Sequence, residues 1–198
     1  ALYLSAQGQS FTANSALCSG WTSSEVLQSR WGSDYAANMQ RLQSLAARTG
    51  QTVLLYNGQP AAACYHAISS GHTEASQNVW GGQLPYLCGV DSAWDKFADG
   101  YEVTIQYSAE QVRTALEELG LTPDDSPESW VGASTWDKAG YVRTLELCDQ
   151  IVSGLEVRKA LDLRSTCFAI AWRGGQFVIT TRGYGHGVGL SQYGAKAM

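Results

Sequence analysis

The chain has 198 residues, of which 44% are hydrophobic and 16% charged, so it is long and apolar enough to bury a core of its own. Its 13 lysines and arginines are outnumbered by 18 aspartates and glutamates, which gives a net charge of −5. This balance argues against a protein that binds the phosphate backbone of nucleic acids. No apolar run approaches the roughly 18 residues of a membrane-spanning helix. The sequence therefore predicts one globular domain, or one such domain with an appendage.

The N-terminal part of the chain is predicted to contain two helices. Thr22-Ser-Ser-Glu25 has the form of a capping box and marks the start of the first helix. A second helix is expected over 33–48, because apolar residues recur there at spacings of four and three. Gly50 is a natural C-terminal stop for that helix.

After residue 50 the apolar pattern changes to that of β-strands. Asn57-Gly58 between the segments 52–56 and 59–66 indicates a β-hairpin, because both turn residues tolerate a positive φ. Residues 101–107 alternate between apolar and polar and are expected to form a half-buried strand. A helix over 108–119 follows, opened by a Ser-x-x-Gln capping box.

The C-terminal half is predicted to be rich in strands. Residues 121–138 hold two prolines and several acids and are expected to form a surface loop. A strand over 141–148, a short helix opened by the capping box Ser153-x-x-Glu156, and a hairpin of 167–172 with 176–180 follow. Helices and strands do not alternate regularly, so the predicted class is α+β. We expect a single compact domain of antiparallel sheets and hairpins with several short helices.

A glycine-rich segment near the C-terminus is the most unusual part of the sequence. Glycine occupies every second position from Gly183 to Gly189, which implies close packing or unusual backbone angles. The spacing fits neither GxGxxG nor a P-loop, so a nucleotide site is not expected. Two interpretations remain: a tight turn packed on a sheet, or a ligand-binding wall. The wall would carry the side chains of His186, Ser191, Gln192 and Tyr193.

A second polar segment, Ser69-Ser-Gly-His-Thr-Glu74, offers hydroxyl, imidazole and carboxylate groups that suit a hydroxyl-rich ligand. Trp80 follows closely and offers a stacking face. The alternative is that Thr73 and Glu74 only satisfy hydrogen bonds of the loop. We expect this segment and the glycine-rich segment to face each other across one cleft. A Ser-His-Asp hydrolase is disfavoured, because the sequence has no GxSxG motif.

These segments resemble the signatures of the SpoIID/LytB family. Gly183–Ala195 is similar to the family's C-terminal motif, and Ser69–Glu74 with Val79-Trp80 and Pro85-Tyr-Leu87 is similar to its middle motif. Ser153–Arg158 resembles the stretch that lies between the two. The resemblance covers nearly all of residues 1–198, and the C-terminal motif is the most specific.

The resemblance implies a peptidoglycan lytic transglycosylase that cleaves MurNAc-β-1,4-GlcNAc bonds of denuded glycan strands. It forms 1,6-anhydro-MurNAc and acts in sporulation and engulfment. The implied location is extracytoplasmic, in the cell envelope, with a wall amidase as partner and membrane attachment only through an N-terminal anchor outside this chain. No partnership with nucleic acid is implied. The alternative is a non-catalytic module that binds wall glycan or activates an amidase.

The family's catalytic glutamate lies in a Pro-x-Glu-Met-like motif upstream of a segment whose tail resembles Ala1-Leu-Tyr3. We therefore expect no catalytic residue within 1–198, and a SpoIID-like domain that lacks its catalytic-helix segment and its extreme C-terminus. No cofactor is expected to be required. Sporulation members often bind zinc through one histidine and two cysteines, which makes Cys18 a candidate ligand, although Thr12 stands at the expected histidine. The resemblance and the residue chemistry together give these substrate-binding candidates: Ser69, Ser70, Thr73, Glu74, Trp80, His186, Ser191, Gln192 and Tyr193.

Overall fold

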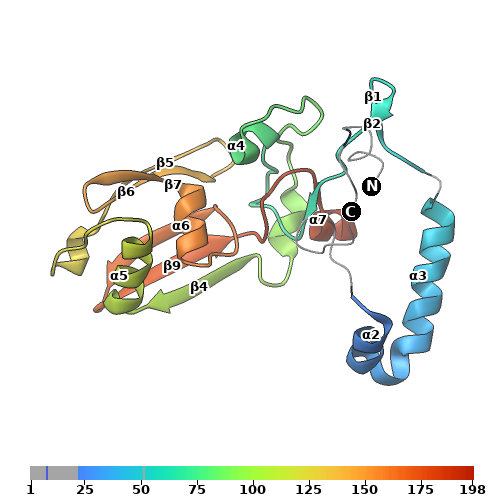
Figure 1. Ribbon diagram of the computed structural model, residues 1–198, viewed down its shortest axis with the longest axis horizontal. Helices are drawn as coiled ribbons and strands as arrows, with labels where there is room; N and C mark the ends of the chain where they lie inside the picture. Colours follow the sequence, from blue (N-terminus) through green and yellow to red (C-terminus); the bar gives the residue numbers. More distant parts are fainter. Residues whose placement is uncertain (1–7, 9–21, 51) are drawn as a thin grey trace. The chain divides into compact units, whose positions relative to one another are not determined.

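The computed structural model describes residue 8, residues 22–50 and residues 52–198 (Figure 1). Its helices and antiparallel sheets confirm the predicted α+β class. We expected one compact domain, whereas the contacts of the chain divide it into two compact units, Ala1–Ala63 and Cys64–Met198. Among the described residues, no helix combines the length and the apolar character needed to cross a bilayer.

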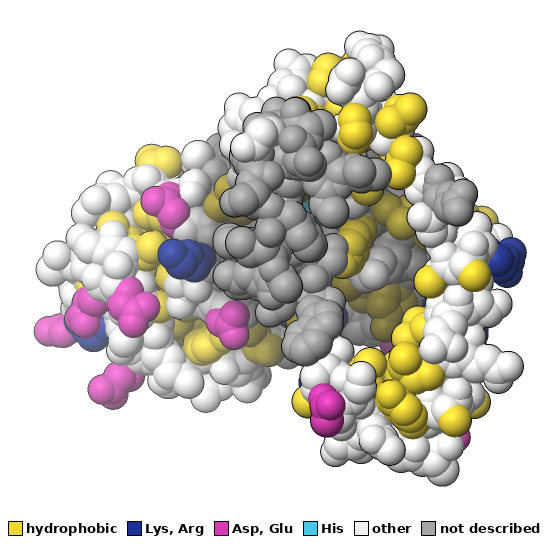
Figure 2. All heavy atoms as spheres, turned by 45° about the vertical axis from the view of Figure 1, so that its right-hand side comes forward, with side chains coloured by type: hydrophobic (Ala, Val, Ile, Leu, Met, Phe, Trp, Pro, Cys, Tyr) yellow, Lys and Arg dark blue, Asp and Glu magenta, His cyan; other side chains and the backbone are white. Residues whose placement is uncertain are grey.

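The first unit contains the two predicted helices and the first hairpin. Its described elements are α2 (Ser24–Trp31), η1 (Gly32–Asp34), α3 (Tyr35–Thr49), β1 (Leu55–Tyr56) and β2 (Gln59–Pro60). The hydroxyl of Ser23, not that of Thr22, caps α2 by accepting from the amide of Val26, because neighbouring hydroxyl residues leave the sequence pattern ambiguous by one position. No residue of α2 or α3 is buried, and hydrophobic side chains remain at the surface of this unit (Figure 2).

The second unit is built on two three-stranded antiparallel sheets and a short parallel pair. The first sheet has the order β4-β9-β8 and the second β5-β6-β7, while β10 pairs in parallel with β3. The strands are β3 (Tyr65–His66), β4 (Glu102–Tyr107), β5 (Val131–Trp136), β6 (Val142–Leu147), β7 (Gln150–Ser153), β8 (Phe168–Arg173), β9 (Gln176–Arg182) and β10 (Leu190–Ser191). The helices are α4 (Ser76–Trp80), η2 (Ala93–Phe97), α5 (Ala109–Glu118), η3 (Pro127–Ser129), α6 (Gly154–Ala160) and α7 (Gln192–Ala197).

The hydrophobic core joins both three-stranded sheets to α5 and α6, which lie beside them in Figure 1. Leu145 of β6, Val157 of α6 and both Phe177 and Ile179 of β9 have no exposed surface. Both helices begin at the capping boxes that the sequence predicted, Ser108 with Gln111 and Ser153 with Glu156. The core therefore fixes one rigid frame for the loops that precede β4 and follow β9.

The prediction of a surface loop over 121–138 is wrong. The segment includes η3 and β5, and its Trp130 is 1% exposed and stacks on Phe177 with ring centroids 5.6 Å apart. The strand has no regular alternation, because β5 is an edge strand whose register against β6 is interrupted by bulges. Pairing with β6, and not the local pattern, makes this segment a strand.

The second strand of the predicted hairpin 59–66 also has a different partner. β2 pairs with β1 only over Gln59–Pro60, across the Asn57-Gly58 turn, where φ is 50° and 76°. Tyr65 and His66 pair instead with Leu190 and Ser191 of β10. This long-range pairing carries the end of the glycine-rich segment to the start of the second unit.

Candidate functional site

Two segments, which we name the loop (residues 69–74) and the glycine ribbon (residues 183–193), pack directly on each other. The amide of Glu74 donates to the carbonyl of Gly187 over 2.7 Å. Isolated β-bridges join Glu74 to Val188 and Ile68 to Tyr184. The structure thus brings together the two segments that the sequence singled out, but they are joined by backbone hydrogen bonds and are not opposite walls of a cleft.

The alternating glycines of the ribbon serve both close approach and unusual backbone angles. Gly183, Gly185, Gly187 and Gly189 all have positive φ, of 79°, 112°, 79° and 79°. A Cβ on Gly187 would lie 2.7 Å from the hydroxyl oxygen of Tyr141 and 3.2 Å from Cβ of Glu74. No larger residue fits this position without displacing the loop, so the glycine pattern is the sequence signature of the loop–ribbon contact.

A buried carboxylate, that of Asp95 in η2, ties the loop to the ribbon. Asp95 is fully buried, and its Oδ2 accepts from both the amide and the hydroxyl of Ser69. Its Oδ1 accepts from the hydroxyl of Ser191 over 2.5 Å. Ser69 and Ser191 are themselves 0% and 4% exposed, so their hydroxyls are engaged with Asp95. Sequence reasoning missed Asp95, which carries no local signal beyond an acid between Trp94 and Lys96.

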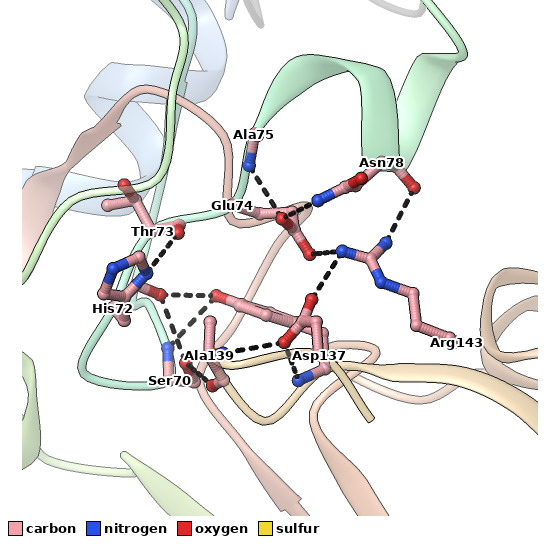
Figure 3. A network of polar contacts seen from close by, with 10 residues as sticks. Ser70, His72, Thr73, Glu74, Ala75, Asn78, Asp137, Ala139 and Arg143 are labelled. Carbon is pink, nitrogen blue, oxygen red and sulfur yellow. Dashed lines mark hydrogen bonds and ion pairs between the residues drawn. The ribbon is translucent and has the colours of Figure 1, made fainter. Parts of the chain in front are cut away.

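The carboxylate of Glu74 belongs to a second polar network (Figure 3). Glu74 is 4% exposed, and its Oε1 accepts from the amide of Ala75 over 2.7 Å and from the side chain of Asn78 over 2.8 Å. Its Oε2 accepts from Arg143, 2.9 Å away, and Arg143 also donates to Asp137 over 2.5 Å. Burial, followed by the nearby carboxyl of Asp137, raises the pKa of Glu74 above its ordinary value. Both carboxylate oxygens of Glu74 therefore already have donors from the protein.

Tyr141 holds the backbone of the loop through hydrogen bonds of its hydroxyl group. Its hydroxyl donates to the carbonyl of His72 over 3.1 Å and accepts from the amide of Ser70 over 3.2 Å. Burial raises the pKa of Tyr141 to about 12, so the hydroxyl keeps its proton at neutral pH. The backbone of the loop is thus held by a permanent donor and acceptor.

His186 lies beside Trp80 and a second histidine that the sequence analysis did not single out. The His186 ring centroid is 5.1 Å from that of Trp80 and 5.8 Å from that of His66. Nδ1 of His186 accepts from the amide of Val188 over 3.1 Å, which leaves the proton on Nε2. Burial lowers the pKa of both histidines, so both are neutral at pH 7.

His66 is buried and carries an unsatisfied nitrogen. Its Nδ1 lies 3.1 Å from the carbonyl oxygen of Val188, which assigns the proton to Nδ1. Its Nε2 is buried and has no hydrogen-bond partner among the residues that the structure describes. The only sequence signal for His66 was its position at the end of a predicted hairpin.

The remaining predicted site residues differ in how accessible they are. Thr73 is 3% exposed, and its hydroxyl accepts from the amide of Val90, so Thr73 and Glu74 both satisfy bonds of the loop, as one of the two interpretations predicted. Trp80 is 50% exposed, and Ser70 and His186 are half-buried. Gln192 and Tyr193 open α7, and both side chains are exposed. Cys18 lies outside the described residues, so the zinc site stays a prediction.

The chain is similar in sequence to several known proteins, although no family model matches it. The chain is 35% identical over 179 residues to Stage II sporulation protein D of Bacillus subtilis (strain 168), an alignment that covers 90% of this chain and 51% of that protein. The same protein of Bacillus amyloliquefaciens is 36% identical over the same shares. An "Amidase enhancer" of Bacillus subtilis is 26% identical over 203 residues, 76% of this chain and 28% of that protein.

The similarities to Stage II sporulation protein D cover 90% of this chain, and they confirm the predicted resemblance. The chain belongs to the SpoIID family, that of Stage II sporulation protein D. It spans about half the length of the curated relatives that it matches.

Proposed function

We propose that this chain forms the glycan-binding part of an extracytoplasmic peptidoglycan lytic transglycosylase of sporulation. The observation that carries the proposal is the direct packing of the loop on the glycine ribbon, in a chain aligned over 90% of its length with Stage II sporulation protein D. Beside this contact the half-buried imidazole of His186 and the exposed indole of Trp80 lie together. An exposed indole suits the apolar face of a sugar ring, and the His186 ring supports the Trp80 indole from 5.1 Å away.

The proposed reaction needs one carboxyl group that acts twice. The protonated acid gives its proton to the glycosidic oxygen between MurNAc and GlcNAc, and the resulting carboxylate then removes the proton of the MurNAc C6 hydroxyl. That oxygen closes the 1,6-anhydro ring, so no water enters the products. We propose that a glutamate located before Ala1 in the full-length protein supplies this acid, and that no cofactor is required.

Glu74 is a poor candidate for this acid despite its raised pKa. Its two oxygens already accept hydrogen bonds from Arg143, Asn78 and the amide of Ala75. Only 5% of the Glu74 side-chain surface is exposed. A proton donor needs an oxygen within hydrogen-bond reach of the substrate. The role of Glu74 that its contacts support is to hold the loop against the ribbon.

The experiment compares the full-length protein with residues 1–198 on peptide-free glycan strands, with products identified by mass spectrometry. We expect 1,6-anhydro products from the full-length protein and none from residues 1–198. Replacement of the upstream glutamate by glutamine should abolish turnover and leave glycan binding nearly unchanged. Anhydro products made by residues 1–198 alone would overturn the proposed location of the acid and favour Glu74.

A second candidate function is activation of a wall amidase without glycan cleavage. The observation in its favour is the 26% identity to a protein named Amidase enhancer. A wall amidase incubated with intact peptidoglycan would then release stem peptides faster when this chain is added, and no anhydro sugar would form. A rate that the chain does not change would remove this candidate. Under either function, the partners are peptidoglycan strands and a wall amidase.

A further inference from the structure

A groove of about 800 Å³ in the second unit is separate from the ring cluster of His186 and Trp80, since neither residue lines it. Its lining includes Ser70, Lys96, Tyr101, Trp136, Thr180 and Arg182. The volume falls within the range of roughly 300–1,000 Å³ that is typical of small-molecule sites. The groove therefore has room for a short segment of a polymer.

The wall of the groove is a defined part of the fold and not a gap between mobile side chains. The hydroxyl of Tyr101 donates to the carbonyl of Ser70 over 2.7 Å, and the hydroxyl of Ser70 donates to the carbonyl of Ala139 over 2.8 Å. These bonds connect the start of β4, the loop and the turn before β6. Further lining residues come from β8 and β9, whose register is continuous across the sheet.

One large aromatic side chain lies in the groove with much of its surface exposed. Trp136, the last residue of β5, is 55% exposed. An indole combines a large apolar face with a rigid ring, so it binds a flat apolar surface at low entropic cost. The C–H faces of pyranose rings are such surfaces, which makes a sugar a suitable occupant beside Trp136.

Of the two cationic side chains that line the groove, Lys96 and Arg182, one is available to pair with an anionic ligand. Arg182 is paired with Glu102, with Nε and Oε2 2.8 Å apart. Lys96 is exposed and forms no ion pair with any residue that the structure describes. A Cβ on Gly71 would lie 2.7 Å from Cε of Lys96, so this glycine lets the lysine stem lie against the loop. The ammonium group is thus positioned at the groove without a protein anion.

We infer that this groove is a second saccharide-binding site and that it prefers carboxylated sugars. Trp136 stacks on a pyranose ring, and Lys96 pairs with the carboxylate of the same or the next sugar. In the choice of ligand the inference rests on the proposed function, because muramic acid exposes its lactyl carboxylate once the stem peptide is removed. A nucleic acid is a poor occupant, because Glu102 lines the groove and the chain has a net charge of −5.

The test measures binding of two soluble oligosaccharides to purified residues 1–198 by titration calorimetry. One is a peptide-free tetrasaccharide of alternating GlcNAc and MurNAc, and the other is chitotetraose, which has no carboxylate. We expect about fivefold tighter binding of the carboxylated sugar at low salt, the upper range for an exposed ion pair, and a smaller difference at high salt. Equal affinities for the two oligosaccharides, or binding of neither, would overturn the inference.

Variants locate the binding in the groove. Trp136→Ala should weaken binding of both oligosaccharides about tenfold, with partial recovery in Trp136→Phe. Lys96→Met should lower only the affinity for the carboxylated sugar, to the value for chitotetraose. Trp94→Ala and Lys159→Met are matched controls, since both side chains are exposed and neither lines the groove. Controls that reproduce the losses would contradict the assignment, and thermal unfolding verifies that each variant is folded.

The outcome is independent of turnover. Absence of anhydro products from the full-length protein would remove the proposed reaction and leave a preference for carboxylated sugars intact. Loss of that preference, with turnover retained, would remove the role of the groove alone.

Discussion

Ser69 and Ser191, one in the loop and one at the end of the glycine ribbon, donate hydroxyl hydrogen bonds to opposite oxygens of the same buried carboxylate, that of Asp95. A carboxylate is suited to this position because both of its oxygens accept, whereas a neutral amide offers only one acceptor. Asp95 therefore determines how the loop and the ribbon meet, although it belongs to neither.

Replacement of Asp95 by alanine should destabilise the fold, because it leaves two buried hydroxyls and an amide without their acceptor. We expect a loss of about 3 kcal/mol in the free energy of unfolding, measured with urea. Asp99→Ala is the control, since Asp99 is an exposed acid close by. A loss no larger than that of the control would contradict the structural role of Asp95.

The glycine ribbon allows steric contact to be separated from backbone strain. Gly187 and Gly175 both have φ of 79°, but a Cβ on Gly187 meets Tyr141 and Glu74 whereas a Cβ on Gly175 meets nothing within 4 Å. Alanine at either position should cost about 1–2 kcal/mol of unfolding free energy from the left-handed backbone. Gly187→Ala should cost about 1–3 kcal/mol more than Gly175→Ala because of overpacking. Equal losses in urea unfolding would show that the close contact relaxes at no cost.

Replacement of Arg143 by methionine should leave Glu74 and Asp137 as neighbouring carboxyls without their shared cation. We expect a loss of about 2–3 kcal/mol in unfolding free energy near neutral pH, less than for a fully buried pair because the Arg143 side chain is 30% exposed. Glu74→Gln in the same chain should restore part of it. Arg173→Met, at the exposed end of β8, is the control and should change little.

The pH dependence of the Arg143→Met variant follows from the raised pKa of Glu74. A carboxyl whose pKa is higher in the folded than in the unfolded chain stabilises the fold below its ordinary pKa, and this stability is lost as the pH rises through the folded value. Loss of the Arg143 cation raises the pKa of Glu74 further. The variant should therefore be closest to the parent near pH 4.5, as urea unfolding across pH would show. A deficit that grows toward acid would contradict this network.

Acid should destabilise the fold through His66. Burial is the main reason that the pKa of His66 lies below its ordinary 6.5, so the unfolded chain binds this proton more readily than the folded chain. The corresponding stability is present above about pH 6.5 and is lost as the pH falls toward the folded pKa. His66→Asn keeps a donor for Val188 and should reduce the dependence of unfolding free energy on pH between about 7.5 and 5.5. His186 titrates in the same direction, so part of the slope should remain.

The matched control for this experiment is His72→Asn, because the His72 side chain is 37% exposed and also bonds a backbone carbonyl, that of Thr73. This variant gives the slope after removal of a histidine that is less buried than His66. If His66→Asn left the slope unchanged, burial of a neutral His66 would not be the source of acid sensitivity.

His186→Ala, tested in the full-length protein, distinguishes a functional from a structural imidazole. Contact with sugar or with the catalytic acid predicts a loss of turnover of about 1–3 kcal/mol in transition-state stabilisation, with little change in melting temperature. His186 makes two hydrogen bonds to the backbone, one to the amide of Val188 through Nδ1 and one to Tyr65, and water molecules can replace both at this half-buried position. A lowered melting temperature with normal turnover would make the residue structural.

Much of the fold follows from local sequence signals. The capping boxes at Ser108 and Ser153 and the Asn57-Gly58 turn each specify backbone geometry through neighbouring atoms alone, and the structure confirms all three. The glycine pattern of the ribbon likewise indicated tight packing or positive φ before any partner was known. Segments whose state depends on a distant partner were less predictable, as the edge strand β5 and the β3–β10 pair demonstrate.

The residues of the candidate site also differ in whether local sequence or long-range packing determines their role. The sequence by itself determined which two segments are chemically unusual. Polar groups and glycines at such density lower the stability of a fold unless hydrogen bonds or close packing compensate for them. Only the tertiary structure decided that Ser69, Ser191 and Glu74 are engaged with Asp95 and Arg143, while Trp80 and His186 keep accessible surface. The reason is physical: the partners of a buried polar group come from long-range packing, and the type of residue alone does not reveal whether its hydrogen bonds are already made.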